Sequence, residues 1–262
     1  MEIKLDGRTA LITGGSKGLG LATAARFAAS GADVAIVARD NAILEAAAAE
    51  AGRGARGKVE AFSCDVSKLE DIEATYAAVN ARFGKVDILV NNAGAHASGA
   101  FEEITEEMWR QDIDLKLLAA VRLSRLCFPD MKARRWGRII NTLNIFAKAP
   151  RARTTPTAVT RAAAMALTKA LSAEGAPYNI LVNGLVVGVI ESDQLRRAYE
   201  AGGAKGEWED FLKRSAERAQ IPMGRIGRAE EFANAACFFA SDAASYVTGC
   251  TLNVDGGLSP VL

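Results

Sequence analysis

The chain has 262 residues, with 32 lysines and arginines against 31 aspartates and glutamates, so its formal net charge is +1. This balance gives no reason to expect nucleic acid or an anionic membrane as a partner. Four scattered cysteines without a CxxC pair and a single histidine argue against a zinc site, and we expect no metal. The charged N-terminus is not typical of a signal peptide, and no apolar run approaches the roughly 20 residues of a membrane span, so we expect a cytoplasmic protein.

Short aliphatic runs alternate with longer stretches rich in alanine, leucine and charged residues. Strands are predicted at residues 10–12, 34–37, 59–62, 88–90, 139–141, 180–182 and 252–254. Helices are predicted at 18–30, 42–51, 69–83, 106–133, 156–174 and 229–240, with a further pair inside 192–219. This alternation predicts parallel strands joined by right-handed crossovers. We therefore predict one α/β domain over residues 1–262, a Rossmann-like doubly wound parallel sheet of about seven strands with helices on both faces.

A glycine-rich sequence, TGGSKGLG from Thr13 to Gly20, follows the first predicted strand and opens the first helix. Glycines here let backbone N–H groups approach a phosphate, and the helix N-terminus adds a favourable dipole. The spacing TGxxxGxG differs from the GxGxxG of the general dinucleotide motif. A tight turn that needs positive φ angles and binds nothing is the alternative. We expect six residues of this turn to bind a dinucleotide: Gly14, Ser16, Lys17, Gly18, Leu19 and Gly20.

The second predicted strand ends at Ala38, Arg39 and Asp40. An acid at this point accepts hydrogen bonds from a ribose 2′-hydroxyl, whereas a nearby arginine accommodates a 2′-phosphate. Ala38 stands where the acid is expected, while Arg39 and Lys17 offer two cations to one phosphate, which favours NADP(H) over NAD(H). Asp40 weakly favours NAD(H), and the two cations can also be read as solvated surface charges.

Polar and small residues follow the next two predicted strands. The carboxylate of Asp65 is placed either to accept a hydrogen bond from an adenine amino group or to cap the next helix. Asn92, Ala93 and Gly94 end the fourth strand, and their small size would let the backbone pass close to a cofactor.

These segments resemble the short-chain dehydrogenase/reductase family over essentially the whole chain. The resemblance rests on TGGSKGLG at 13–20, Asp65-Val66, NNAG at 91–94, GRIIN at 137–141 and VDGG at 254–257. It implies that these segments bind NAD(P) and that the Lys17 and Arg39 pattern goes with NADP. It also implies a homo-oligomer, a tetramer or a dimer, formed through the predicted helices 106–133 and 156–174.

Members of that family transfer a proton with an Asn, a Ser, a Tyr and a Lys, and all four positions differ here. Alignment on residues 137–141 places Asn144 at the serine and Thr157, thirteen residues later, at the tyrosine. Arg161 then stands at the lysine, four residues further on, and Asp114 stands at the asparagine. After the sixth strand, the usual Pro-Gly is replaced by Val-Gly at Gly188. A hydroxyl that contacts the carboxamide in the family is kept four residues later, at Ser192.

Thr157 is the most consequential difference, because a threonine hydroxyl is a far weaker acid than a phenol, whose pKa is about 10. Asn144 can still donate a hydrogen bond to a carbonyl. Arg161 shares a helix face with Thr157 and can still hold ribose hydroxyls, although its planar fork differs from an ammonium. Asp114 is placed to pair with Arg161. The alternative is a structural hydrogen-bond cluster that fills a retired active site.

Two other side chains are candidates for the missing acid or base. His96 follows NNAG directly and has an unperturbed pKa of about 6.5. We expect replacement of His96 by alanine to abolish native turnover; a surface or packing histidine is the alternative. Tyr199 lies in the charged segment 191–220, which we predict to be a mobile lid over the site.

Three functions are consistent with this sequence. The first is an NADP(H)-dependent oxidoreductase that acts on a small carbonyl or alcohol with a rebuilt proton relay. The second is a non-catalytic NADP(H)-binding protein, a regulatory or assembly subunit. The third is a lyase or isomerase on the same scaffold, with His96 or Asp114 as the base. The fold alone does not choose among them.

Overall fold

The computed structural model describes residues 3–203 and 206–262. Seven parallel strands form its central sheet, in the order β3-β2-β1-β4-β6-β8-β9. This confirms the predicted Rossmann-like, doubly wound α/β fold. Each predicted strand is present and is longer by one or more residues. The strands are β1 (Thr9–Thr13), β2 (Asp33–Ala38), β3 (Val59–Ser63), β4 (Ile88–Asn91), β6 (Gly137–Asn144), β8 (Ile180–Val187) and β9 (Thr251–Val254).

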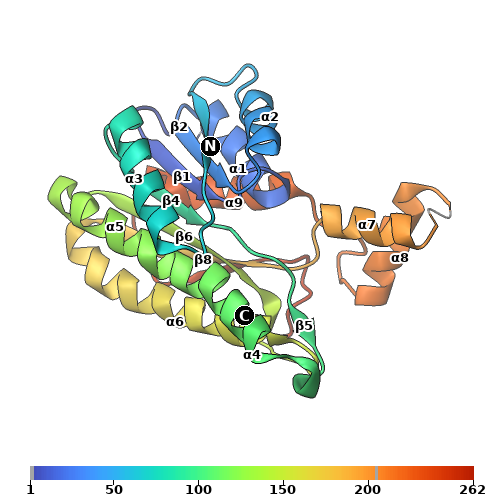
Figure 1. Cartoon of the computed structure of the whole chain (residues 1–262). Helices are drawn as coiled ribbons and strands as arrows, with labels where there is room; N and C mark the ends of the chain where they lie inside the picture. The colour runs from blue at the N-terminus through green and yellow to red at the C-terminus, as the bar shows by residue number, and fades with distance from the viewer. Residues whose placement is uncertain (1–2, 204–205) are drawn as a thin grey trace.

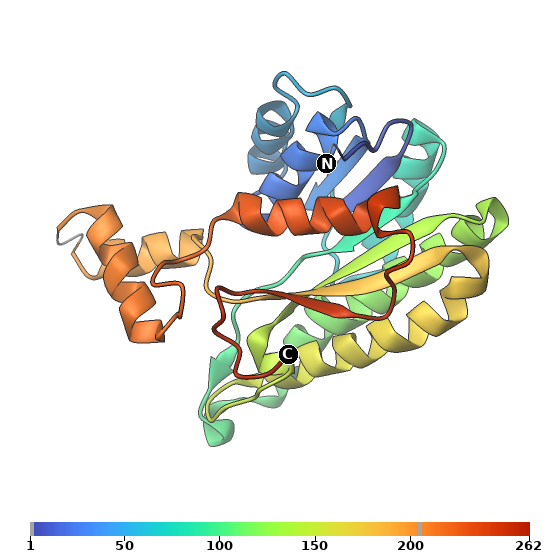
Figure 2. The ribbon, with the colours of Figure 1, turned by 180° about the vertical axis from the view of Figure 1, so that it is seen from behind.

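Helices cover both faces of the sheet (Figures 1 and 2). One layer contains α1 (Gly18–Ala29), α2 (Asn41–Ala51) and α9 (Ala229–Ala240), and the other contains α3 (Leu69–Phe83), α5 (Ala119–Arg134) and α6 (Thr157–Gly175). Alternate residues of a strand point to opposite faces. In β1, Ile12 therefore joins the core under α1 and α9, and Leu11 joins the core under α3 and α5. Burial on both faces explains why the strands are continuously apolar.

The sequence predicts one continuous helix over residues 106–133, and the structure corrects this. Three segments follow one another there: α4 (Glu106–Ile113), a π-helical turn η2 (Asp114–Leu118) and α5. A π turn is a single-turn local event that is frequent at functional sites, and hydrophobic periodicity averages over several turns, so it does not reveal one. Within this turn the side chain of Lys116 is buried.

A short antiparallel pair, β5 (Ser98–Gly99) with β7 (Thr155–Pro156), is a second feature that the sequence does not predict. It ties the loop after β4 to the start of α6, where the backbone N–H of Thr157 donates to the carbonyl of Ala97 at 3.3 Å. A strand of two residues is too short to show a detectable alternation of apolar and polar residues in the sequence. This pairing holds Thr157 beside the loop that contains His96.

The predicted helix pair after β8 consists of α7 (Asp193–Ala201) and α8 (Trp208–Ala219), which project from the rest of the molecule (Figure 1). Residues 204 and 205 of the predicted lid range 191–220 lie outside the described residues. Tyr199, Trp208 and Phe211 pack against one another with ring centroids 5.3–5.4 Å apart. This aromatic cluster joins the two helices.

Within the described ranges, no helix is both long enough and apolar enough to cross a membrane.

Candidate functional site

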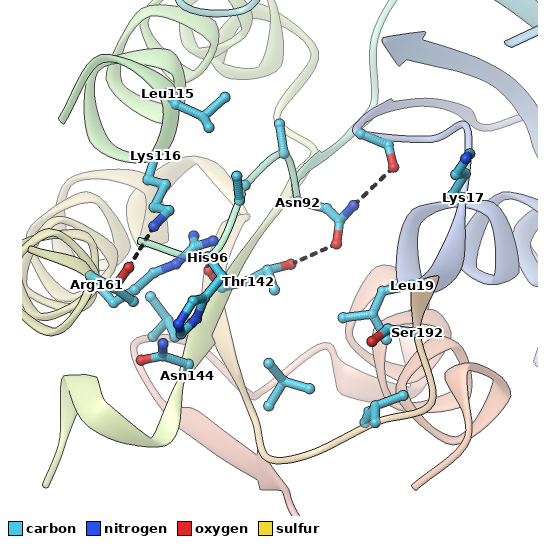
Figure 3. A pocket seen from close by; sticks show the side chains of 18 of the residues that line it. Lys17, Leu19, Asn92, His96, Leu115, Lys116, Thr142, Asn144, Arg161 and Ser192 are labelled. Carbon is cyan, nitrogen blue, oxygen red and sulfur yellow. Dashed lines mark hydrogen bonds between the residues drawn. The ribbon is translucent and has the colours of Figure 1, made fainter. Parts of the chain in front are cut away.

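A cavity of about 730 Å³ opens where the parallel strands end. The strand order reverses between β1 and β4, and sheets of this type bind ligands outside such a reversal. Figure 3 shows that one end of the cavity carries Lys17 and the other carries Lys116 and Arg161. The lining includes most of the predicted site residues: Gly14, Ser16, Lys17, Leu19, Arg39, Asp65, Val66, Asn92, Ala93, Gly94, His96, Asn144, Thr157, Arg161, Gly188 and Ser192.

The glycine turn after β1 is built for close backbone approach. Gly14 and Gly18 have φ angles of +65° and +52°, which a residue with a Cβ rarely adopts. A Cβ on Gly20 would collide with the carbonyl oxygen of Gly14 and lie 2.7 Å from Nδ2 of Asn92. Gly18 and Gly20 thus shape the turn rather than line the cavity. Helix α1 starts after Lys17 without a side-chain cap, and uncapped N–H groups at a helix N-terminus are the groups that bind anions in other proteins.

Asn92 ties this turn to the end of β4. Its amide nitrogen donates to the carbonyls of Thr13 at 3.0 Å and Gly14 at 3.2 Å, and its amide oxygen accepts from Thr142 at 3.5 Å. Figure 3 shows Asn92 between the two ends of the cavity. The backbone N–H groups of Asn92 and Ala93 both donate to the hydroxyl of Thr13. These bonds fix the loop on which Gly94 and His96 follow.

The acids near the ends of β2 and β3 have different roles. Asp40 is the N-cap of α2 and accepts from the N–H of Ile43 at 3.1 Å, so its carboxylate already has a structural partner. Arg39 lines the cavity. Asp65 also lines it and does not cap α3, whose N-cap is Lys68. Burial raises the pKa of Asp65, but hydrogen bonds from Ser67 and the charge of Arg39 outweigh burial and leave the pKa below its ordinary value.

A buried polar chain lies at the other end of the cavity. The ammonium of Lys116 donates to Thr157 Oγ1 at 2.7 Å and forms an ion pair with Asp112, one turn earlier. The hydroxyl of Thr160 donates to the second oxygen of Asp112 at 2.6 Å. The side chains of Lys116 and Asp112 are 1% and 2% exposed, so this ion pair is removed from solvent.

Burial lowers the pKa of Lys116, because water no longer stabilises the ammonium. The hydrogen bond to Asp112 opposes this shift, and the charge of Arg161 adds to it. Burial likewise lowers the pKa of Arg161, to about 10, with Asp112 opposing. Arg161 therefore stays a cation at neutral pH. Its guanidinium donates to the backbone carbonyl of Thr142 at 2.6 Å.

His96 and Asn144 lie beside this chain. Figure 3 shows His96 among Thr142, Asn144 and Arg161, at the end of the cavity away from Lys17. The amide oxygen of Asn144 is buried and has no hydrogen-bond partner among the residues that the structure describes. Such an orphaned acceptor is costly unless a ligand or water satisfies it. Asn144 therefore offers a ligand a preformed polar contact.

Asp114 does not take the place that the sequence analysis expects. It is not among the lining residues, and its carboxylate lies 3.6 Å from the guanidinium of Arg122. The acid whose charge acts on Arg161 is Asp112. The π turn explains the difference, because it places Lys116 rather than Asp114 in the cavity wall. The expected pairing of Asp114 with Arg161 was wrong.

Lys116 is a charged residue of the cavity wall that the sequence did not reveal. One signal was available: Asp112 and Lys116 stand four residues apart on a predicted helix, the spacing of an ion pair on one face. Such pairs usually lie on a solvated surface, so the sequence gives no reason to expect this one in a buried wall. Only the packing of α4 and η2 against α6 shows that it is buried.

The loop after β8 forms part of the cavity wall, from Gly188 to Ser192. Ser192 is the N-cap of α7, where its hydroxyl accepts from the N–H of Leu195 at 3.5 Å. The indole N–H of Trp208 donates to Glu191 at 3.0 Å, and the guanidinium of Arg196 lies 3.9 Å from the Trp208 ring. The Tyr199 hydroxyl donates to the carbonyl of Gly206 at 2.7 Å, and Tyr199 is not among the lining residues.

No group of three or more His, Cys, Asp or Glu side chains among the described residues is arranged to hold a metal ion.

The chain is similar to known proteins over nearly its whole length. A family model described as "Enoyl-(Acyl carrier protein) reductase" matches residues 14–259. The 3-oxoacyl-(acyl-carrier-protein) reductase FabG of Escherichia coli K12 is 34% identical over 256 residues, covering 98% of this chain and 99% of that protein.

Solved structures are similar to this one as well. The L-sorbose reductase of Gluconobacter frateurii, complexed with NADPH and L-sorbose, has a TM-score of 0.94 and 36% identity, with 100% of both chains covered. An NADPH-bound short-chain oxidoreductase from Pseudomonas aeruginosa PAO1, described as containing an atypical catalytic center, has a TM-score of 0.91 and 34% identity. It covers 99% of this chain and 100% of its own.

Proposed function

The chain belongs to the short-chain dehydrogenase/reductase family, and we propose that it is an NADP(H)-dependent oxidoreductase with a non-standard proton relay. The observation that carries this proposal is a single cavity with two differently built ends. One end has a glycine turn for a dinucleotide, and the other has a buried Lys116, Thr157 and Arg161. A small carbonyl or alcohol would bind at the second end.

The cavity fits NADP(H). The start of α1, which has no side-chain cap, and the turn at Gly14, which has no side chain, are suited to the pyrophosphate. Lys17 and Arg39 would hold the 2′-phosphate, and Asp65 with Val66 would contact the adenine. The NNAG segment, Arg161, Gly188 and Ser192 would hold the nicotinamide half. The similar reductase from Gluconobacter frateurii contains NADPH, which supports this assignment. When bound, NADP(H) supplies the hydride chemistry, and the protein supplies position and electrostatics.

The relay would differ from that of the family at every position. Asn144, Thr157 and Arg161 stand for the serine, tyrosine and lysine, and Lys116 rather than Asp114 stands in the cavity wall near them. A threonine hydroxyl releases a proton at neutral pH less readily than a tyrosine hydroxyl does, so another group must be the source of the proton. His96 is one candidate, because it lines the same cavity.

We extend the proposal to two features of the whole molecule. Residues 191–220 would act as a lid, because Glu191, Ser192 and Leu195 line the cavity while α7 and α8 project from the rest of the molecule. A homo-oligomer, a tetramer or dimer, would form through α5 and α6. Light scattering after size exclusion tests the second feature, and a monomer at micromolar concentration contradicts it.

A titration of the purified protein with NADPH and NADH, followed by nicotinamide fluorescence, tests the cofactor assignment. A screen of carbonyl substrates with NADPH oxidation as the readout then tests the activity; L-sorbose and a 3-oxoacyl thioester are the first probes. Binding of NADPH without turnover of any carbonyl favours the second candidate function, a regulatory or assembly subunit. Turnover that neither consumes nor produces NADPH favours a lyase or isomerase with His96 as base.

A further inference from the structure

We propose that Lys116 supplies the proton in this site and passes it to the substrate oxygen through the hydroxyl of Thr157. The inference rests on the proposed function, since it concerns how the oxidoreductase completes its reaction. It gives the cavity a two-residue relay drawn from α6 and the π turn η2, in place of a single tyrosine.

The contact geometry is that of a relay. Lys116 Nζ donates to Thr157 Oγ1 at 2.7 Å, a normal charge-assisted distance. Because this oxygen already accepts from Lys116, the hydroxyl can donate its own proton elsewhere. Thr157 and Lys116 both line the cavity, so a carbonyl oxygen placed there can receive that proton. Thr157 is thus the residue that touches the reacting oxygen, and Lys116 is the source behind it.

The surrounding charges favour release of the proton from Lys116. The charged groups that act on it are Asp112 from α4 and Arg161 from α6. Asp112 is shared, since Thr160 also donates to it and its charge acts on Arg161 as well. Two buried cations therefore depend on one carboxylate. Loss of a proton by Lys116 removes the excess positive charge of the cluster, whereas the guanidinium of Arg161 does not give up its proton.

The proton balance is complete. The hydride, which bound NADPH would give up as it is oxidised to NADP⁺, forms a C–H bond with the carbonyl carbon and leaves the π electron pair on the oxygen. That oxygen takes the proton of the Thr157 hydroxyl as the O–H bond of the product forms. Thr157 Oγ1 takes a proton from the Lys116 ammonium, which becomes a neutral amine. The amine is reprotonated from water after the product leaves, and oxidation of an alcohol runs the same path in reverse.

Matched substitutions separate a relay from a structural ion pair. Lys116→Arg keeps the charge toward Asp112 but cannot release a proton, and Thr157→Ser keeps the hydroxyl that Thr157→Val removes. With NADPH and L-sorbose as the probe, we expect Lys116→Arg and Thr157→Val to lower kcat/KM at least ~100-fold, the usual contribution of general acid catalysis. The kcat/KM of Thr157→Ser should stay within about tenfold of the wild-type value. In all three variants the affinity for NADPH should stay within about threefold of the wild-type affinity.

A second measurement does not need a substrate. NMR of protein labelled with ¹⁵N-lysine, loaded with NADPH, follows the Lys116 ammonium; Lys116→Arg identifies its signal. We expect the pKa of Lys116 to lie below about 10.4, the ordinary lysine value. In variants that turn over, the high-pH fall of kcat/KM for reduction should follow this pKa.

The outcomes distinguish the two proposals. A wild-type protein that binds no NADPH or reduces no carbonyl contradicts the proposed function. Where binding and turnover are present, full activity of Lys116→Arg, or a Lys116 pKa at or above 10.4, overturns the relay. Loss of the high-pH fall of activity in His96→Gln would also overturn it, because the proton would then come from His96.

Discussion

The guanidinium of Arg161 lies directly against Gly94, on the loop after β4. A methyl group on Gly94 would come 2.5 Å from Nη2 of Arg161, closer than van der Waals radii allow. Arg161 is held on its other side by the carbonyl of Thr142. A glycine at position 94 is therefore a condition for a buried arginine at position 161.

Gly94→Ala should displace Arg161 and weaken NADPH binding roughly tenfold while leaving the fold intact, because the clash falls on a side chain in the cavity. The titration of nicotinamide fluorescence measures this. Gly99→Ala is the control, since its methyl group would meet the end of the Ile104 side chain at 3.0 Å and Oε2 of Glu103 at 3.9 Å, and neither residue lines the cavity. Equal affinities of the two variants would show that Arg161 does not contact the cofactor.

Lys17→Ala combined with Arg39→Ala should lower the affinity for NADPH by about 10- to 100-fold and change the affinity for NADH little, because each cation is worth one charge-assisted contact to the 2′-phosphate. Calorimetric titration with both cofactors gives the ratio. Arg53→Ala, an exposed cation outside the cavity, serves as the control. A parallel loss for NADH would mean that the two cations act on the pyrophosphate instead.

Restoring the family's relay should create ordinary reductase activity. The variant carries Lys116→Asn, Asn144→Ser, Thr157→Tyr and Arg161→Lys, all at residues that line the cavity. A phenol beside an ammonium is a much better acid than a threonine hydroxyl, so we expect NADPH-dependent reduction of generic ketones at least ~100-fold above the wild type. Circular dichroism checks the fold. A folded variant that binds NADPH but stays inactive would show that the cavity positions no ketone.

Glu231→Gln tests an acid-sensitive contact away from the cavity. The guanidinium of Arg225, followed by the backbone N–H of Arg228, lowers the pKa of Glu231 from 4.5 to about 2. The contribution of this contact to the stability of the folded state is therefore complete above pH 4.5 and is lost as the pH falls through about 2. Because Glu231 is partly exposed, we expect a loss of only about 0.5–1 kcal/mol at pH 7.

Thermal unfolding of wild type and Glu231→Gln at a series of pH values measures this difference. It should stay constant at higher pH and narrow only below pH 4.5, as the pH falls toward 2. Glu45→Gln, an exposed glutamate of α2, is the control and should show no such trend. A difference that does not vary with pH would indicate that the side-chain geometry matters rather than the charge.

The sequence by itself determined the fold and the cofactor end of the cavity. Both depend on local patterns: strands that are apolar throughout because helices cover both faces, and a glycine turn whose backbone conformation excludes side chains. Gly14, Lys17, Arg39 and Asn92 lie along one cavity because parallel strands all end at the same edge. The position of such residues in the fold can be predicted from the number of residues that separate them from the end of a strand.

Only the tertiary structure decided the other end of the cavity. A π turn of five residues places Lys116 in the wall and leaves Asp114 beside Arg122, and no sequence pattern marks that turn. The partner of Lys116 is Thr157, 41 residues away, and the two meet because α4 and η2 pack against α6. The same ion pair on a solvated helix would be a weak surface contact. Burial between these segments is the main cause of the lowered pKa of Lys116 and places this side chain in the cavity wall.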